Sequence, residues 1–149
     1  MKIAIGSDHA GVRLKDKIKN AVEGVEFTDV GTNSEESTDY PDHIGKVAIA
    51  VRSGSADLGI GICGTGIGAS ITANKFSGIR AALCTNEFMA EMSRRHNDSN
   101  VLILGARVTG DDLALAIVRR WLSSTFEGGR HQRRLDKIKA IEQNGGHAG

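Results

Sequence analysis

The sequence predicts an α/β fold, in which a five-stranded parallel sheet is covered by helices on both faces. Five short apolar segments alternate with stretches whose apolar residues recur at helical spacing, and the connections between them are short. This alternation is typical of right-handed β-α-β units. At 149 residues the chain is long enough for one substantial core and too short for two. We therefore expect a single domain over residues 1–149.

The predicted strands are β-rich apolar runs that end at glycines or polar residues. They cover residues 3–5, 25–30, 58–63, 79–84 and 101–104. The helices between and after them are expected at 12–22, 40–51, 69–74, 87–95, 111–124 and about 130–143, the last as an additional C-terminal helix. That helix is expected to bury Leu135, Ile138 and Ile141, and residues 144–149 are expected to form a flexible tail.

Composition argues against several classes of protein. Lys and Arg total 19 against 18 Asp and Glu, and only 4% of residues are aromatic, so neither nucleic acid nor an acidic membrane is an expected partner. The two cysteines form no C-x-x-C pair, which indicates neither a disulfide framework nor a zinc site. Since no apolar run approaches the ~20 residues that span a bilayer, we expect a cytoplasmic protein.

The stretch from Leu58 to Ser70 predicts an anion site. Its apolar run stops at Cys63 and is followed by glycines at 64, 66 and 68, as in a strand, a tight loop and a helix start. Backbone N–H groups there would stabilise the thiolate of Cys63, making it a candidate base or nucleophile. The alternative interpretation is that Cys63 is a small buried apolar residue.

A dinucleotide-binding loop is a second interpretation of the same glycines. Gly64, Gly66 and Ala69 match the G-x-G-x-x-G/A fingerprint, and Glu87 lies near the distance of a ribose-binding acid. The motif follows the third predicted strand rather than the first, and little chain remains for a substrate domain. These two facts weaken the interpretation without removing it.

Other candidate residues lie at two edges of the predicted sheet. Asp8, His9 and Tyr40 would share the carboxyl edge with Cys63, although Asp8 could equally be a helix N-cap. His96 precedes the fifth strand at the opposite edge, where it either favours a helix C-terminus or serves a site shared with another subunit. Because Asp8, His9, Cys63 and His96 include no ligand pair at i,i+3 or i,i+4, we predict no metal.

Three arginines are candidate phosphate ligands. Arg130 and Arg134 are four residues apart near a helix start, and Arg107 follows the fifth strand. Guanidinium groups match phosphate oxygens, although a solvated basic face would have the same pattern.

Motifs along the chain, taken together, resemble the type B ribose-5-phosphate isomerases. They are Gly6-Ser7-Asp8-His9-Ala10-Gly11, Thr38-Asp39-Tyr40-Pro41, Ile62-Cys63-Gly64-Thr65-Gly66-Ile67-Gly68, Ala73-Asn74-Lys75, Gly78-Ile79-Arg80-Ala81, Arg95-His96-Asn97-Asp98 and Glu127-Gly128-Gly129-Arg130-His131. The resemblance covers Met1 to about Gln143. It implies a Rossmann-like three-layer α/β/α sandwich, homodimers with shared active sites that in some members pair into tetramers, and neither a metal nor a nucleotide cofactor.

The resemblance also implies roles for the candidate residues. Cys63 would be the base that moves a proton between C1 and C2 of ribose 5-phosphate, and His96 the acid that opens the furanose ring, with Asp8 and Tyr40 assisting. The developing enediolate would be held by the loop of Gly64, Thr65, Gly66, Ile67 and Gly68, with Thr65 among its donors. The phosphate and nearby hydroxyls would be bound by His9, Asn97, Arg107, Arg130 and Arg134.

Some members of the family carry serine at the cysteine position and take the base from a glutamate further along. In this sequence Ala69-Ser70-Ile71 offers no carboxylate, which leaves Cys63 as the candidate base.

Two alternatives stay open beside this hypothesis. Subunits of galactose-6-phosphate isomerase share the motifs, so allose 6-phosphate or galactose 6-phosphate is an alternative substrate. The other alternative is a non-catalytic module that binds a nucleotide or a sugar phosphate.

Overall fold

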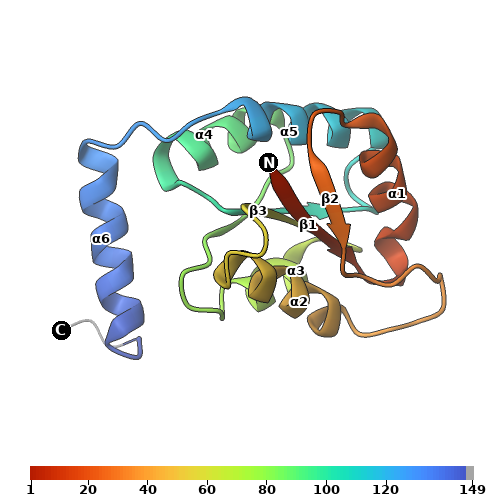
Figure 1. The fold of residues 1–149 in the computed structure, drawn as a ribbon, viewed down its shortest axis with the longest axis horizontal. Coiled ribbons are helices and arrows are strands. Elements are labelled where there is room, and N and C mark those ends of the chain that lie inside the picture. Colours follow the sequence, from red (N-terminus) through yellow and green to blue (C-terminus); the bar gives the residue numbers. More distant parts are fainter. Residues whose placement is uncertain (147–149) are drawn as a thin grey trace.

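The computed structural model describes residues 1–146 and has three layers, with a parallel sheet between two layers of helices (Figure 1). The sheet order is β2-β1-β3-β5-β4, and every neighbouring pair is parallel. The strands are β1 (Lys2–Ser7), β2 (Glu26–Asp29), β3 (Leu58–Cys63), β4 (Ala81–Leu83) and β5 (Val101–Gly105). This confirms the predicted α/β fold with its five-stranded parallel sheet.

Helices cover the sheet on both faces (Figure 1). One face carries α1 (Val12–Ala21), α4 (Glu87–Asn97) and α5 (Asp111–Ser123), whereas the other carries α2 (Tyr40–Arg52) and α3 (Ile67–Ala73). A short 3-10 helix, η1 (His9–Gly11), leads from β1 into α1. Each face of the sheet has its own apolar core. Trp121 lies in the core beneath α1, α4 and α5, and Ile44 and Val47 lie in the core beneath α2 and α3. Because β3 and β5 are buried on both faces, they are apolar throughout rather than alternating.

The strand order reverses between β1 and β3. From β1 the chain moves outward to β2, and from β3 it moves the other way, to β4 and back to β5. Ser7 pairs with Ile62, so β1 and β3 end level with each other. Ligands of doubly wound sheets bind at such a switch point, beyond the carboxyl ends of the strands. Asp8 and Cys63 follow or end these two strands and therefore share that edge.

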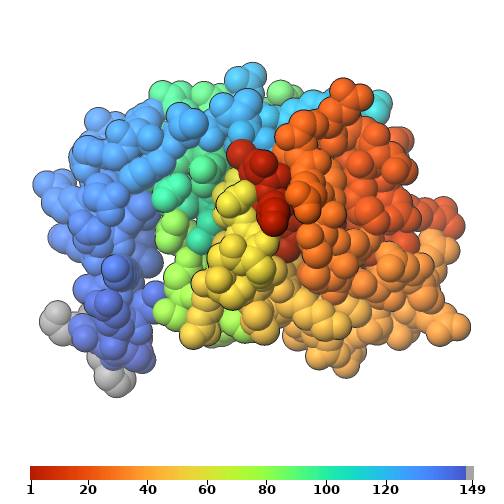
Figure 2. Space-filling view, in the orientation of Figure 1, coloured from red at the N-terminus to blue at the C-terminus, as the bar shows by residue number. Residues whose placement is uncertain are grey.

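The last helix, α6 (Arg130–Gln143), stands at one end of the molecule, outside the sandwich (Figures 1 and 2). The predicted burial of its apolar residues is wrong: Ile138 is 51% exposed and Ile141 46% exposed, and Leu135 is only partly buried. No element of residues 1–146 covers that face of α6. Instead, the three side chains line a groove of about 520 Å³ between α6 and the body of the chain.

Residues 144–146 close α6 with a hydrogen-bonded turn. The Gly146 N–H donates to the Ile141 carbonyl at 2.9 Å, in the pattern of a glycine C-cap. The remaining residues of the predicted tail, 147–149, lie outside the described part of the chain.

Several predicted boundaries are wrong, and for two elements the reason can be identified. The strand expected at 79–84 is only Ala81–Leu83. At its start the Ala81 N–H donates to Oδ1 of Asn74 at 2.8 Å, where a neighbouring strand would otherwise accept the bond. Helix α4 continues to Asn97 and ends at Asp98, whose φ of 44° reverses the chain, so His96 lies on the helix rather than in a connector. None of the helices within residues 1–146 is both long and apolar enough to cross a bilayer.

Candidate active site

A pocket of about 470 Å³ opens at the carboxyl ends of β1 and β3, the switch point of the sheet. Cys63 is the last residue of β3 and is only 4% exposed. Its Sγ accepts a hydrogen bond from the Gly66 N–H at 3.2 Å. A donor aimed at the sulfur stabilises the thiolate, which is the form of cysteine that acts as a base. The pocket is lined by Asp8, Tyr40, Cys63, Gly64, Thr65, Ile67, Gly68, Ile71 and Arg107.

The loop between β3 and α3 depends on two glycines. Gly66 has a φ of 81°, and a Cβ on it would lie 2.5 Å from Cδ1 of Leu83. A Cβ on Gly68 would lie 2.4 Å from Cζ of Tyr40, the first residue of α2. The Tyr40 ring therefore rests directly against the loop, at the mouth of the pocket. Larger residues at either position would push the loop away from its neighbours.

Asp8 serves two purposes in this geometry. Its Oδ1 accepts the Ala10 N–H at 3.0 Å, which makes it the N-cap of η1, and the residue also lines the pocket. His9 lies beside it, with Nδ1 accepting the Thr38 N–H at 3.2 Å, and does not line the pocket itself. Thr65 is exposed, and its Oγ1 accepts the Ile67 N–H at 3.3 Å.

Arg107 extends the site from β5. Its N–H donates to the Gly64 carbonyl at 2.9 Å, so the segment after β5 is tied to the glycine loop. The side chain is exposed and lines the pocket, which puts a cation within reach of an anionic ligand.

The structure separates the predicted site residues into two groups. The residues that line this pocket or adjoin it form the first group, which we name the Cys63 half-site and define as Asp8, His9, Tyr40, Cys63, residues 64–68 and Arg107. The other predicted residues do not line that pocket and lie around the end of α4 and the start of α6. We name this second group the His96 half-site and define it as His96, Asn97, Arg130 and Arg134.

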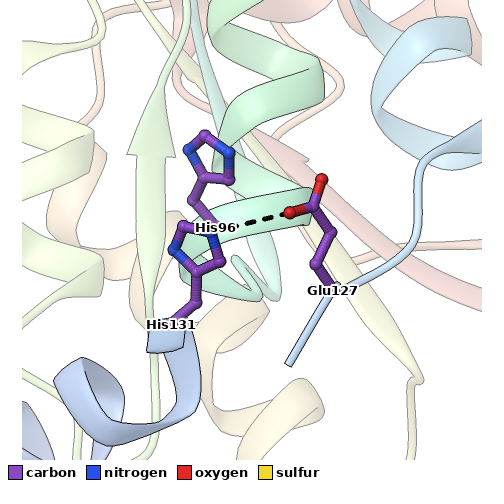
Figure 3. A group of neighbouring side chains, drawn as sticks. All are labelled: His96, Glu127 and His131. Atoms are coloured by element: carbon purple, nitrogen blue, oxygen red, sulfur yellow. Dashed lines mark ion pairs between the residues drawn. The ribbon is translucent and has the colours of Figure 1, made fainter. Parts of the chain in front are cut away.

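Sequence reasoning assigned no role to two residues beside the His96 half-site, Glu127 and His131. The His131 ring stacks on that of His96, with centroids 4.2 Å apart and planes 10° from parallel (Figure 3). Oε2 of Glu127 lies 3.6 Å from Nε2 of His131, and its Oε1 accepts from Nε of Arg95 at 2.5 Å. Both residues stand in the motif Glu127-Gly128-Gly129-Arg130-His131, and their four-residue spacing suits an ion pair, but neither observation indicates that His131 stacks on His96.

The electrostatics of this cluster follow from burial and charge. Burial lowers the pKa of the His131 imidazole, and the positive charges of His96, Arg130 and Arg134 lower it further. The hydrogen bond from Arg95 lowers the pKa of the Glu127 carboxyl. At neutral pH, His131 is therefore uncharged and Glu127 is ionised.

The cluster is also the one group of three potential metal ligands found within residues 1–146. Ligand atoms of His96, Glu127 and His131 lie within 4.8 Å of one another. However, an imidazole binds a metal in its own ring plane, about 2.0–2.1 Å from nitrogen. The planes of two stacked rings do not converge on a common point near their nitrogens, so this arrangement does not suit a metal ion.

The dinucleotide interpretation fits the structure poorly. Glu87 begins α4, which follows the edge strand β4, and β5 lies between β4 and β3. A ribose-binding acid belongs at the end of the strand next to the glycine loop. The glycine loop after β3 therefore has no such partner in Glu87.

Known proteins share the sequence and the fold of this chain. The profile of the family described as Ribose/Galactose Isomerase matches residues 3–138. Ribose-5-phosphate isomerase B of Escherichia coli K12 is 56% identical, over 95% of this chain and 97% of its own. The solved ribose-5-phosphate isomerase B of Clostridium thermocellum is 58% identical and superimposes with a TM-score of 0.95, over 97% of this chain and 99% of its own.

A third relative was solved with a sugar phosphate. Ribose-5-phosphate isomerase B of Mycoplasma genitalium, with bound ribulose-5-phosphate, is 43% identical and has a TM-score of 0.90. The alignment covers 95% of this chain and 96% of that one. From its sequence profile, its relatives and its fold, this chain belongs to the Ribose/Galactose Isomerase family.

Proposed function

We propose that this protein is an aldose–ketose isomerase that interconverts ribose 5-phosphate and ribulose 5-phosphate through an enediolate, without a cofactor. The observation that carries the proposal is the Cys63 sulfur, held by the Gly66 N–H at the bottom of a pocket at the switch point of the sheet. Relatives named ribose-5-phosphate isomerase B share more than half of its residues. These relatives support the same substrate for this chain.

The isomerisation step follows from the pocket. The Cys63 thiolate removes the proton from C2 of the open-chain aldose, and the electron pair moves to form the C1–C2 double bond of an enediolate. The hydroxyl proton of O2 passes to O1, and Cys63 returns its proton to C1 as the C1–C2 double bond becomes the C2 carbonyl of the ketose. Negative charge develops on two oxygens beside the sulfur, where N–H groups of the glycine loop and the Thr65 hydroxyl can donate. A preorganised donor of this kind typically lowers a barrier by about 2.7–4 kcal/mol.

Ring opening comes first, because ribose 5-phosphate is mainly a furanose. His96 gives a proton to the ring oxygen as the C1–O bond breaks, and a base takes the proton of the anomeric hydroxyl. Asp8 and Tyr40 assist at the ring and hydroxyls. The phosphate, remote from the reacting carbons, is bound by the arginines Arg107, Arg130 and Arg134, with His9 and Asn97, and its binding energy positions C1 and C2.

The acid and the base come from different copies in this proposal. Within one chain, His96 and Cys63 belong to half-sites at opposite edges of the sheet. A two-fold homodimer would set the His96 half-site of each copy over the Cys63 half-site of the other, giving two complete sites.

Exposed apolar residues flank both half-sites, as a dimer interface requires. Ile67 and Ile71 of α3 border the Cys63 pocket and are 57% and 59% exposed. Ile138 and Ile141 of α6 line the groove beside the His96 half-site. Bringing the half-sites together would bury both patches, and burial of apolar surface gives roughly 25 cal/mol per Å². This supports a homodimer rather than a monomer.

Six-carbon sugar phosphates are a second candidate for the substrate, favoured by the family description, which includes galactose isomerases.

The two cysteines, both free within residues 1–146, support a reducing compartment such as the cytoplasm.

The test is conversion of ribose 5-phosphate by the purified protein in the presence of a chelator, beside Cys63→Ala. Cys84→Ala is the matched control, because Cys84 is also buried but does not line the pocket. We expect the Cys63 change to lower kcat about 10²–10⁴-fold and the Cys84 change to leave it within about twofold. Turnover of allose 6-phosphate instead would assign the six-carbon alternative, and a folded protein that turns over neither sugar would contradict the proposal.

A further inference from the structure

His131 has no role in the reaction described above, although its ring stacks on that of His96. His131 is 5% exposed and His96 is partly exposed, so one ring forms a buried support and the other can reach a ligand. Nε2 of His131 has no hydrogen-bond partner within residues 1–146. Glu127 Oε2, at 3.6 Å, is too far away to accept a hydrogen bond from it. Leaving a buried ring nitrogen without a partner is costly, which indicates that the ring is held for another purpose.

From this geometry we infer that His131 is a positioning residue, whose flat ring under His96 fixes the orientation in which the His96 imidazole meets the ring oxygen of the sugar. The inference rests on the proposed function, because it assigns His131 to the ring-opening step. An imidazole that can rotate about its Cβ–Cγ bond holds its proton in many directions, whereas one that lies on a second ring is restricted to one plane. The His96 and His131 ring centroids are 4.2 Å apart and their planes 10° from parallel, so the His131 ring restricts the rotation of the His96 ring.

The support is suitable because it is uncharged. His96 carries a positive charge when it is protonated for catalysis, and a second cation stacked on it would oppose that protonation. Burial keeps the proton off His131 by lowering its pKa. Ionised Glu127 lies beside the pair and contributes the opposite charge.

The surrounding contacts keep His131 beneath His96. Arg95, the neighbour of His96 on α4, donates to Glu127 at 2.5 Å, and the Glu127 N–H donates to the Arg95 carbonyl at 3.0 Å. The His131 N–H donates to the Gly128 carbonyl at 3.1 Å, at the start of α6. These bonds tie the first turn of α6 to the last turn of α4, on which the two rings lie.

The experiment separates ring opening from proton transfer. Ribulose 5-phosphate is acyclic, since phosphorylation of its terminal oxygen leaves no hydroxyl that could close a five-membered ring. Exchange of its C1 hydrogen with deuterium from D₂O therefore needs Cys63 but no ring opening. Turnover of ribose 5-phosphate needs both steps. The variants are His131→Leu, which removes the flat ring, and His131→Phe, which keeps a flat ring without its nitrogens.

We expect His131→Leu to lower kcat for ribose 5-phosphate at least tenfold, with KM and deuterium exchange both within twofold of the unchanged protein. His131→Phe should restore kcat to within threefold. Equal losses of turnover and exchange in His131→Leu would show a merely structural role and overturn the inference. Unchanged turnover in His131→Leu, or a His131→Phe as slow as His131→Leu, would overturn it as well.

A second measurement does not depend on activity. In proton NMR spectra, the stacked His131 ring should shift the His96 ring C–H resonances upfield, and His131→Leu should remove that shift while His131→Phe keeps it. If His96 resonances were the same in all three proteins, His131 would not hold His96. If the unchanged protein neither turns over ribose 5-phosphate nor exchanges ribulose 5-phosphate, the proposed function fails, and the NMR result still decides whether the stack orients His96.

Discussion

The Cys63 half-site and the His96 half-site are built by different means. Cys63 is 4% exposed at the end of a central strand, and its loop lies against side chains of α2 and β4 and against the backbone of β5. The His96 half-site lies where α4 ends and α6 begins, and α6 leaves Ile138 and Ile141 about half exposed. The single chain therefore completes the pocket around Cys63, whereas it leaves the apolar side chains of α6 beside the His96 half-site uncovered.

Gly66→Ala tests the part of this contrast that belongs to the fold. We expect it to lower the free energy of unfolding by about 2–5 kcal/mol, from a left-handed backbone and from overpacking against Leu83. Gly54→Ala is the matched control, because Gly54 has a φ of 78° but nothing within 4 Å of a Cβ. Urea unfolding followed by fluorescence of the buried Trp121 measures both. Equal losses would show that the loop is not tightly packed.

Ile138→Asp tests the exposed apolar face of α6 beside the His96 half-site. Ile138 is 51% exposed in the single chain, so its change should hardly alter the stability of one subunit. In a symmetric dimer two carboxylates would enter apolar surroundings, and at about 1–3 kcal/mol each the dimer Kd should rise at least about 30-fold. Activity should fall with the dimer fraction, as measured by sedimentation at several concentrations.

Lys137→Asp serves as the control for that variant, since Lys137 is exposed on the same helix and does not line the groove. A dimer equally weakened by both variants, or by neither, would contradict an interface at the groove.

The pH dependence of stability should give the smallest effect. Burial lowers the pKa of His131 below its ordinary value of 6.5, so the unfolded chain takes up the proton at a higher pH than the folded one. The contribution of neutral His131 to the free energy of unfolding is complete above about pH 6.5 and is lost as the pH falls below that value. The urea midpoint should therefore fall more for the unchanged protein than for His131→Phe between about pH 7.5 and pH 5.5. Parallel curves would mean that His131 takes up its proton alike in both states.

The sequence predicted the sheet, because the strands have clear apolar runs and glycine ends. It also predicted that Asp8 and Cys63 share an edge, since this follows from parallel strands alone. It failed at α6, where helical spacing of Leu135, Ile138 and Ile141 indicates an apolar face but not what covers it. Periodicity along one chain carries no information about a second copy.

Lys15 shows a second limit of sequence reasoning. It belongs to a lysine-rich stretch that looks like a solvated face, yet it is fully buried and its Nζ donates to Asp29 at 3.0 Å and to Asn33 at 3.0 Å. The stacking of His131 under His96 is of the same kind. Both are side-chain contacts between segments far apart in the sequence, which spacing does not reveal.

The most direct test of the central claim, that each site takes its base and acid from different copies, is complementation. Cys63→Ala and His96→Ala are purified separately, each nearly inactive, and then mixed under conditions that exchange subunits. Random pairing makes half of the dimers mixed, each with one intact site of two, so turnover of ribose 5-phosphate should recover to about a quarter of the unchanged protein's. If activity stays at the level of the separate variants although mixed dimers have formed, Cys63 and His96 do not act across subunits.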